Sequence, residues 1–201
     1  MSRPFVLGLT GSIGMGKSTT AAMFAEAGLP VWDADSAVHR LYAPGGAAVP
    51  AIAALCPAAV GPDGVDRAVL KDWLARSDGG LARLEAAVHP LVAEDRRGFI
   101  RDAADRGADI VVLDVPLLFE TGADAACDGT LTVTAPPEVQ RARVLARPGM
   151  TPETFAILLA RQMPDAEKRA RADHVIETRS LAATRAAVHS LIDRLREHRH
   201  D

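Results

Sequence analysis

Residues 11–19 read Gly-Ser-Ile-Gly-Met-Gly-Lys-Ser-Thr, and this stretch constrains the fold more than any other part of the chain. Its spacing matches the phosphate-loop pattern G-x-x-x-x-G-K-[ST]. The apolar run at 5–9 is long enough for a buried strand, and the alanine-rich residues 18–27 have the pattern of a helix that Gly28 ends. Strand, loop and helix in this order are the context that a phosphate loop requires. The sequence therefore predicts an α/β fold with an anion-binding loop near residue 11.

Several kinds of group in this loop suit phosphate oxygens. Glycines let the chain curl with its amide N–H groups pointing inward, and the following helix presents its positive N-terminal end. Lys17 adds a mobile positive charge, and the Ser18 hydroxyl is a ligand for Mg²⁺. A glycine-rich surface turn is the alternative interpretation, but lysine is rare in this chain. We expect ATP to contact the following residues: Gly11, Ser12, Ile13, Gly14, Met15, Gly16, Lys17, Ser18 and Thr19.

The composition excludes several kinds of protein. The 201 residues suffice for one sizeable core, and the net charge of −3 gives no reason to expect a nucleic acid or an anionic membrane as partner. Cys56 and Cys127 do not form a C-x-x-C pair, so we expect reduced thiols and a cytoplasmic location. We also expect no transmembrane segment, because no apolar run approaches roughly 18 residues, and no signal peptide, because the phosphate loop begins by Gly11.

Two aspartates follow the short strand predicted at 29–32. Asp35 stands before Ser36-Ala37-Val38 and fits a helix cap. Capping does not readily explain both aspartates, and the carboxyl edge of an open parallel sheet faces the ligand crevice. We therefore interpret Asp33 as a functional residue and leave both interpretations open for Asp35.

A third acid ends the apolar strand predicted at 109–114. Its residues are apolar throughout, as in a strand that is covered on both faces. An acid that closes such a strand downstream of a phosphate loop is the usual partner of Mg²⁺. We favour this role for Asp114 over a helix cap.

Between the second and third strands of this sheet the pattern is helical, and we expect no strand from 39 to 107. Apolar residues recur at helical spacing over 48–55, 67–75 and 81–104. Pro90 falls inside the last of these, so we expect that helix to kink or restart near His89. This segment is predicted to be an insertion that carries acceptor specificity.

The C-terminal third alternates short helices and strands. We expect strands at 129–134 and 173–176, and a closing helix at 181–195 followed by a frayed tail at 198–201. A helix predicted to run to about Arg147 places Arg143 and Arg147 on one face. A second helix begins at Thr151 and ends near Arg161. These arginines suit a mobile lid over phosphates, although a solvated charged face is the alternative.

The sequence partly distinguishes between the classes of protein that contain a phosphate loop. The chain contains no asparagine, so the Asn-Lys-x-Asp guanine reader of a GTPase is absent. A helicase or motor would be larger and more basic. A small kinase, which holds an acceptor hydroxyl in line with the γ-phosphate, fits better.

Motifs over essentially the full length resemble one known family, the dephospho-coenzyme A kinases. They are Gly8-Leu9-Thr10-Gly11, Asp33-Ala34-Asp35, His89-Pro90-Leu91-Val92, Asp114 through Glu120, Gln140 with Arg143, and Arg161-Gln162 through Lys168 to residues 172–176. The resemblance implies a three-layer phosphate-loop fold with a mainly parallel five-stranded sheet, a helical insertion after the second strand and a helical lid. The implied parts of this single domain are a nucleotide-binding core (1–38, 108–140 and 173–201), an acceptor lobe (39–107) and a lid (141–172).

The resemblance also implies a reaction, in which the γ-phosphate of ATP passes to the ribose 3′-hydroxyl of dephospho-coenzyme A with the help of Mg²⁺. It implies ATP and dephospho-coenzyme A as partners, and a monomer or weak homo-oligomer. Lys17 would hold the β- and γ-phosphates, Ser18 would ligate Mg²⁺, and Asp114 would hold the ion through water. Asp33 would orient the hydroxyl and act as its general base, with Asp35 as an orienter or part of the metal shell.

Further roles are expected at the rim of the site. We expect Arg143 to stack on adenine, and Arg147 and Arg161 to reach phosphates from the lid. The expected walls of the acceptor site are Ser36–Leu41, His89, Pro90, Leu117, Leu118 and Phe119.

The chain departs from the family pattern at Glu177-Thr178-Arg179, where the family usually has an Asp-Asn pair and a small residue. This departure argues against an adenine contact from that turn. Two alternatives remain: a kinase of the same build for another small acceptor, such as a nucleoside monophosphate or shikimate, and a nucleotide-binding module without catalysis.

Overall fold

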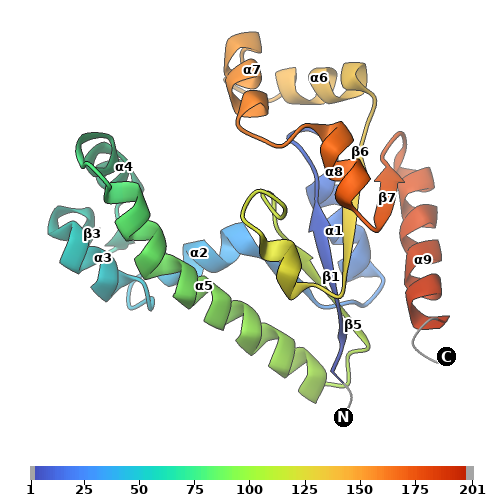
Figure 1. Cartoon of the computed structure of the whole chain (residues 1–201), viewed down its shortest axis with the longest axis horizontal. Coiled ribbons are helices and arrows are strands. Elements are labelled where there is room, and N and C mark those ends of the chain that lie inside the picture. Colours follow the sequence, from blue (N-terminus) through green and yellow to red (C-terminus); the bar gives the residue numbers. More distant parts are fainter. Residues whose placement is uncertain (1–2, 198–201) are drawn as a thin grey trace. The chain divides into compact units, whose positions relative to one another are not determined.

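The computed structural model describes residues 3–197, which form two compact units (Figure 1). The first unit comprises the described residues of 1–32 and 103–201, and the second comprises 33–102. The tail expected to fray at 198–201 lies outside the described residues. Within the described part of the chain, no helix combines the length and the apolar character needed to cross a membrane.

The first unit is built on a five-stranded sheet in the order β2-β5-β1-β6-β7. The strands are β1 (Phe5–Thr10), β2 (Val31–Asp33), β5 (Ile110–Asp114), β6 (Gly129–Thr134) and β7 (His174–Glu177). Strand β1 pairs in parallel with β5 and β6, and β6 pairs in parallel with β7. The α/β prediction with a parallel sheet is confirmed. Because the strands are parallel, their carboxyl ends meet at one edge of the sheet.

One face of this sheet is covered by α1 (Lys17–Glu26) and α9 (Leu181–Glu197). Strand side chains alternate between faces, so Leu7 and Leu9 of β1 lie on the same side as Leu131 and Val133 of β6. All four are fully buried and share one apolar cluster with α1 and α9. This cluster is the core that fixes the strand before the phosphate loop.

The opposite face is covered by the segment after β5 and by α8 (Asp165–Arg171). A Cβ atom at Gly8 would lie 2.7 Å from Cys127 Sγ and 3.0 Å from Leu118, so that segment packs directly on the β1 backbone. Helix α8 contacts β6 (Figure 1). The remaining elements of this unit are η2 (Ala123–Ala126), α6 (Pro137–Leu145) and α7 (Pro152–Ala160). Helices on both faces give the expected three layers.

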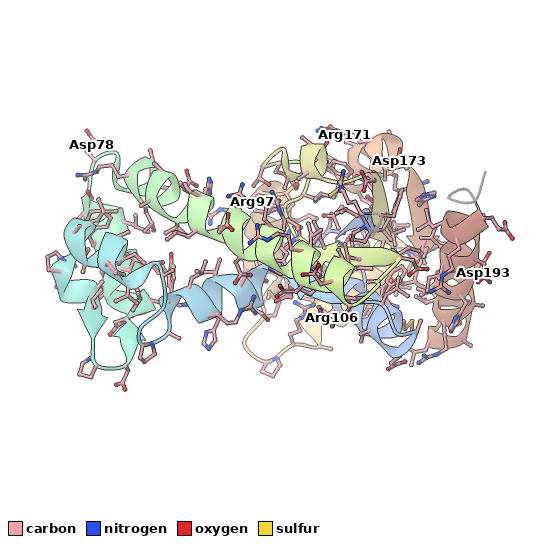
Figure 2. All side chains as sticks on the ribbon, turned by 90° about the horizontal axis from the view of Figure 1, so that it is seen from below. Asp78, Arg97, Arg106, Arg171, Asp173 and Asp193 are labelled. Atoms are coloured by element: carbon pink, nitrogen blue, oxygen red, sulfur yellow. The ribbon has the colours of Figure 1, made fainter. Side chains whose placement is uncertain are left out.

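The second unit is mainly helical. It contains α2 (Ala34–Tyr42), α3 (Val49–Leu55), η1 (Pro57–Ala59), α4 (Arg67–Arg76) and most of α5 (Gly80–Asp105), which continues into the first unit. Its own apolar cluster is centred on fully buried Ile52, with Leu70 of α4 and Leu84 of α5. The figures show α5 as a long helix, and Figure 2 labels Arg97, which donates to Glu94 of the same helix at 2.7 Å.

For this segment one expectation is wrong, and of the kink or restart expected near His89 the restart does not occur. A small antiparallel hairpin, β3 (Val60–Gly61) with β4 (Gly64–Val65), lies in the segment where no strand was expected. Four strand residues are too few to give a periodic signal. Helix α5 runs without interruption through Pro90 instead of restarting there. The proline ring removes one helical hydrogen bond, and the exposure of Ala86 and Pro90 lets water replace it.

The hairpin provides a test of the second unit. Gly64 has φ +90°, and a Cβ atom there would lie 2.3 Å from the carbonyl oxygen of Tyr42. We expect Gly64→Ala to lower the free energy of unfolding by at least about 2 kcal/mol, measured by urea denaturation. Gly61→Ala is the matched control, because its Cβ would meet nothing within 4 Å. Equal urea midpoints for the two variants would contradict the strained geometry at Gly64.

Candidate nucleotide-binding site

The loop that follows β1 can be made only with glycines at two positions. The amide of Met15 donates to the carbonyl of Ser12 at 3.1 Å, which closes a tight turn. Gly14 and Gly16 within and after this turn have φ +79° and +89°, a region that side chains disfavour. A Cβ at Gly14 would also lie 2.5 Å from Val144. Gly16 is the second fixed glycine of the pattern G-x-x-x-x-G-K-[ST], so that position has a direct structural reason, whereas Gly14 stands at one of the variable positions.

Side chains outside the loop hold its carbonyl groups pointing outward. Gln140 Nε2 donates to the carbonyl of Ile13 at 2.7 Å, and Thr178 Oγ1 lies 2.8 Å from the carbonyl of Met15. In a trans peptide the N–H points away from the C=O, so the amides of Gly14 and Gly16 point to the inner side of the loop. Within residues 3–197, no protein atom accepts a hydrogen bond from either amide.

The helix after the loop adds to this inward-facing set of donors. Helix α1 begins at Lys17 with Gly16 as its N-cap, and no side chain caps it. The first N–H groups of any helix have no partner within the helix, and its N-terminal end is positive. Amides that face inward beside an uncapped helix N-terminus are the kind of donor set that suits an anion.

Lys17 and Asp114 are brought together at the base of this site. Lys17 Nζ forms an ion pair with Asp114 Oδ1, and their side chains are only 14% and 5% exposed. Asp114 ends β5 directly beside Leu9 of β1, which explains the contact between residues far apart in the sequence. A buried carboxylate needs a positive partner, and Lys17 supplies it in this state.

The donor set fits Mg²⁺. Magnesium prefers hard oxygen ligands, and in kinases it takes only one or two of them from the protein, with phosphates and water completing the shell. The Ser18 hydroxyl and the Asp114 carboxylate are such ligands. Among the described residues, no group of three or more His, Cys, Asp or Glu side chains is arranged to hold a metal, and a phosphate-bound ion requires none.

The helix cap that the sequence suggested at Asp35 is formed by Asp33 instead. Asp33, not Asp35, is the N-cap of α2, and its Oδ1 accepts from the amide of Ser36 at 2.6 Å. The helix begins at Ala34, two residues earlier than a cap at Asp35 would give, so Asp35 lies in its first turn and is exposed. The same aspartate, Asp33, is therefore both the helix cap and the candidate general base.

The arginines of residues 141–172, the predicted lid, differ in their surroundings. Arg143 Nη1 and Nη2 donate to Thr178 Oγ1 at 2.9 Å and to its carbonyl at 2.6 Å. The prediction that Arg143 and Arg147 share a helix face is wrong, because α6 ends at Leu145. Pro148 disfavours helical backbone at the residue before it, which accounts for this early end.

Arg161 is the C-cap of α7 and is exposed. The side chain of its neighbour Gln162 accepts from the loop amide of Ile13 at 3.0 Å. This bond places the Arg161 backbone close to the phosphate loop.

Thr178 is the site residue that sequence reasoning missed. It is 4% exposed and bonds to the loop, to β6 and to Arg143. The departure from the family pattern at this turn was visible in the sequence. No local pattern predicted that its threonine would reach Met15, because the contact spans 163 positions in the chain.

The expected acceptor residues are unequally accessible. Leu118 and Phe119 are buried, whereas Leu117 is 39% exposed. Arg171 covers the Phe119 ring with its guanidinium carbon 4.9 Å from the ring centre, and Figure 2 labels this arginine. His89 and Pro90 are exposed on α5. Of the apolar trio after β5, only Leu117 presents appreciable surface to a ligand.

A buried ion pair joins the segment after β5 to α8. Lys168 of α8 is fully buried and its Nζ lies 2.8 Å from Glu120 Oε1, which also accepts from the amide of Met163 at 2.8 Å. Burial acts to raise the pKa of Glu120, but the hydrogen bonds from Lys168 and Met163 outweigh it and hold this pKa below its usual value. The pair therefore favours the charged carboxylate.

This pair predicts a pH dependence of stability. Because the pKa of Glu120 is lowered by folding, the pair adds stability above the ordinary pKa of 4.5, and this contribution is lost as the pH falls through the lowered value. Glu120→Gln leaves Lys168 buried without its counter-charge and should cost about 3 kcal/mol at pH 7. The difference from the wild type should shrink below pH 4.5, measured as urea midpoints against pH. Exposed Glu167→Gln on α8 is the control, and parallel curves for Glu120→Gln and the wild type would refute the assignment.

Comparisons with known proteins agree with this geometry. A family model described as dephospho-CoA kinase matches residues 5–183. A dephospho-CoA kinase of Cereibacter sphaeroides is 63% identical over 195 residues, which are 97% of this chain and 98% of that protein. TT1252 from Thermus thermophilus has a crystal structure with a TM-score of 0.81 at 35% identity, over 96% of this chain and 99% of that one. The dephospho-CoA kinase from Campylobacter jejuni shares the fold, with a TM-score of 0.66 at 18% identity over 96% and 98% of the two chains. The chain belongs to the dephospho-CoA kinase family.

Proposed function

We propose that this chain transfers the γ-phosphate of ATP to the ribose 3′-hydroxyl of dephospho-CoA, which gives CoA and ADP in the final step of coenzyme A biosynthesis. The observation that carries the proposal is the loop at 11–19, whose carbonyls are held outward and whose amides face a site beside Lys17 and Asp114. Membership of the family supports the choice of acceptor.

Lys17 changes partner in this proposal. It neutralises Asp114 in the present structure, and a bound triphosphate offers it a larger negative charge. Lys17 then holds the β- and γ-phosphate oxygens together with the amides of Gly14 and Gly16. Phosphoryl transfer depends mainly on such positioning and charge neutralisation.

Ser18 and Asp114 would hold Mg²⁺, Ser18 directly and Asp114 through water. When bound, the ion would neutralise charge on the β- and γ-phosphate oxygens. Once Lys17 has moved to the phosphates, Mg²⁺ would replace it as the positive group near Asp114. The buried carboxylate would then have a positive partner both without and with bound nucleotide.

Asp33 is proposed as the group that orients the acceptor hydroxyl and takes its proton. Its Oδ1 accepts from the Ser36 amide, which fixes the orientation of the carboxylate. Asp35, one residue into α2, is proposed to orient Asp33 or to join the metal shell. Because phosphoryl transfer has a loose transition state, Asp33 would act more by orienting the hydroxyl than by early proton removal.

Other residues are proposed to complete the site. The edges of the Arg143 guanidinium are bonded to Thr178, and its flat faces suit stacking on adenine. Arg147 and Arg161 would reach phosphates from a lid at 141–172. The proposed acceptor walls in the lobe 39–107 and after β5 are Ser36–Leu41, His89, Pro90 and Leu117. We also propose that the enzyme acts in the cytoplasm.

An acceptor comparison tests the function. ADP release should depend on dephospho-CoA and be absent, or at least about 100-fold slower in kcat/KM, with AMP, CMP or shikimate, because a site built to bind an acceptor's polar groups discriminates strongly against molecules that lack them. The measurement is coupled detection of ADP, with phosphorus NMR to locate the new phosphate. Turnover of another acceptor in preference to dephospho-CoA would replace the proposal, and ATP binding without any acceptor-dependent release would favour the non-catalytic module.

Asp33→Asn tests the proposed base. Asparagine is also a good N-cap, so α2 should remain capped while the carboxylate is lost. We expect kcat to fall by about 10²–10⁴-fold with ATP affinity unchanged. Asp66→Asn is the matched control, since Asp66 caps α4 through the amides of Ala68 and Val69 and should leave kcat unchanged. Near-normal turnover of Asp33→Asn would remove Asp33 from the role.

A further inference from the structure

Thr178 joins four segments at the carboxyl edge of the sheet. It follows β7, and its amide donates to the carbonyl of Thr134 at the end of β6 at 2.8 Å. Its hydroxyl lies 2.8 Å from the carbonyl of Met15 in the phosphate loop and accepts from Arg143 of α6 at 2.9 Å. A Cβ atom at Gly16 would meet the Thr178 side chain at 3.0–3.2 Å, so the two residues are in close contact.

The hydroxyl of Thr178 has only one proton to give. The Met15 carbonyl at 2.8 Å is nearer than the Thr134 carbonyl at 3.2 Å, so the proton goes preferentially to Met15. The same oxygen accepts from the positively charged guanidinium of Arg143, which strengthens the bond it donates. The Thr178 oxygen is thus bonded both to the cationic side chain of Arg143 and to the phosphate loop.

This pair of hydrogen bonds controls the direction of one loop amide. The Met15–Gly16 peptide is planar, so a carbonyl held at Thr178 turns the Gly16 N–H to the opposite side, toward the anion site. Without the hydroxyl, this peptide loses its outer hydrogen bond, and glycine at 16 permits it to rotate. Arg143 also loses one of its two bonds to Thr178.

We propose that Thr178 is a positioning residue of the nucleotide site, whose hydroxyl sets the orientation of the Met15–Gly16 peptide and of Arg143 together. This inference rests on the proposed function only in taking ATP as the nucleotide. Nucleotide affinity should then depend on the hydroxyl of Thr178 and not merely on its bulk. Thr178 itself need not touch the nucleotide.

Two substitutions separate the hydroxyl from the packing. Thr178→Val keeps the branched shape against Gly16 and removes the hydroxyl, whereas Thr178→Ser keeps the hydroxyl and removes the methyl group. Binding of Mg·ADP to the full chain, measured by calorimetry, should weaken about 10-fold in Thr178→Val and less than about 3-fold in Thr178→Ser. In turnover, the KM for ATP should rise in Thr178→Val while the KM for dephospho-CoA stays unchanged.

Thr184→Val is the matched control. Thr184 is also buried, at 3% exposure, and its hydroxyl donates to the carbonyl of Ser180 at 2.7 Å in the first turn of α9. This variant should shift the thermal midpoint as much as Thr178→Val does, with wild-type Mg·ADP affinity. An equal loss of affinity in both variants would reduce Thr178 to a structural role and overturn the proposal.

A double variant tests whether Thr178 acts through Arg143. If the two are linked, Arg143→Ala combined with Thr178→Val should weaken Mg·ADP binding less than the product of the single effects. Wild-type affinity in Thr178→Val, an equal loss in Thr178→Ser, or fully multiplicative effects would each overturn the proposal. If the wild-type chain binds Mg·ADP but does not phosphorylate dephospho-CoA, the proposed acceptor is wrong. The Mg·ADP affinities of the Thr178 variants still test the role of Thr178 in that case.

Discussion

The outward tethering of the phosphate-loop carbonyls is the constraint on which the site depends. A loop rich in glycine has little conformational preference of its own, so its amides face inward only if something outside holds its carbonyls. Gln140 and Thr178 provide this hold at Ile13 and Met15. Both follow strands whose carboxyl ends meet at the same edge as that of β1. The parallel sheet is therefore what shapes the anion site, and the loop sequence only permits the shape.

Buried charge is arranged around the same edge. Lys17 pairs with Asp114 at the end of β5, and Lys168 pairs with Glu120 a few residues further on. Each pair avoids the cost of an isolated charge away from water. The two lysines differ in burial, since the Lys17 side chain is 14% exposed and Lys168 is fully enclosed. In the proposed function Lys17 exchanges Asp114 for a bound phosphate, whereas Lys168 keeps Glu120 as its partner.

Some residues that we propose to contact ligands also hold the fold together. Asp33 caps a helix with the carboxylate that we assign to the acceptor hydroxyl, so its orientation is fixed before any ligand arrives. Arg143, which we propose to stack on adenine, is held by two hydrogen bonds to Thr178. Such shared use reduces the ordering cost of binding, because side chains already fixed by the fold lose little freedom when a ligand arrives.

The sequence alone determined the α/β class, the phosphate loop with its strand and helix, the strand that ends in Asp114, and the family, because these follow from local periodicity and from motifs of fixed spacing. Contacts between distant positions were decided only by the tertiary structure. Thr178 reaches Met15 and Lys168 reaches Glu120 only because parallel strands bring their following residues to one edge. The sequence also left some local details undecided or gave them wrongly. The two aspartates compete closely as the cap of α2, and a proline can either interrupt a helix or be accommodated in it, as Pro90 is. The four-residue pairing of β3 with β4 is too short to give a periodic pattern. A spacing rule records what neighbours in the chain prefer, whereas these outcomes depend on solvent exposure and on packing partners that only the folded chain supplies.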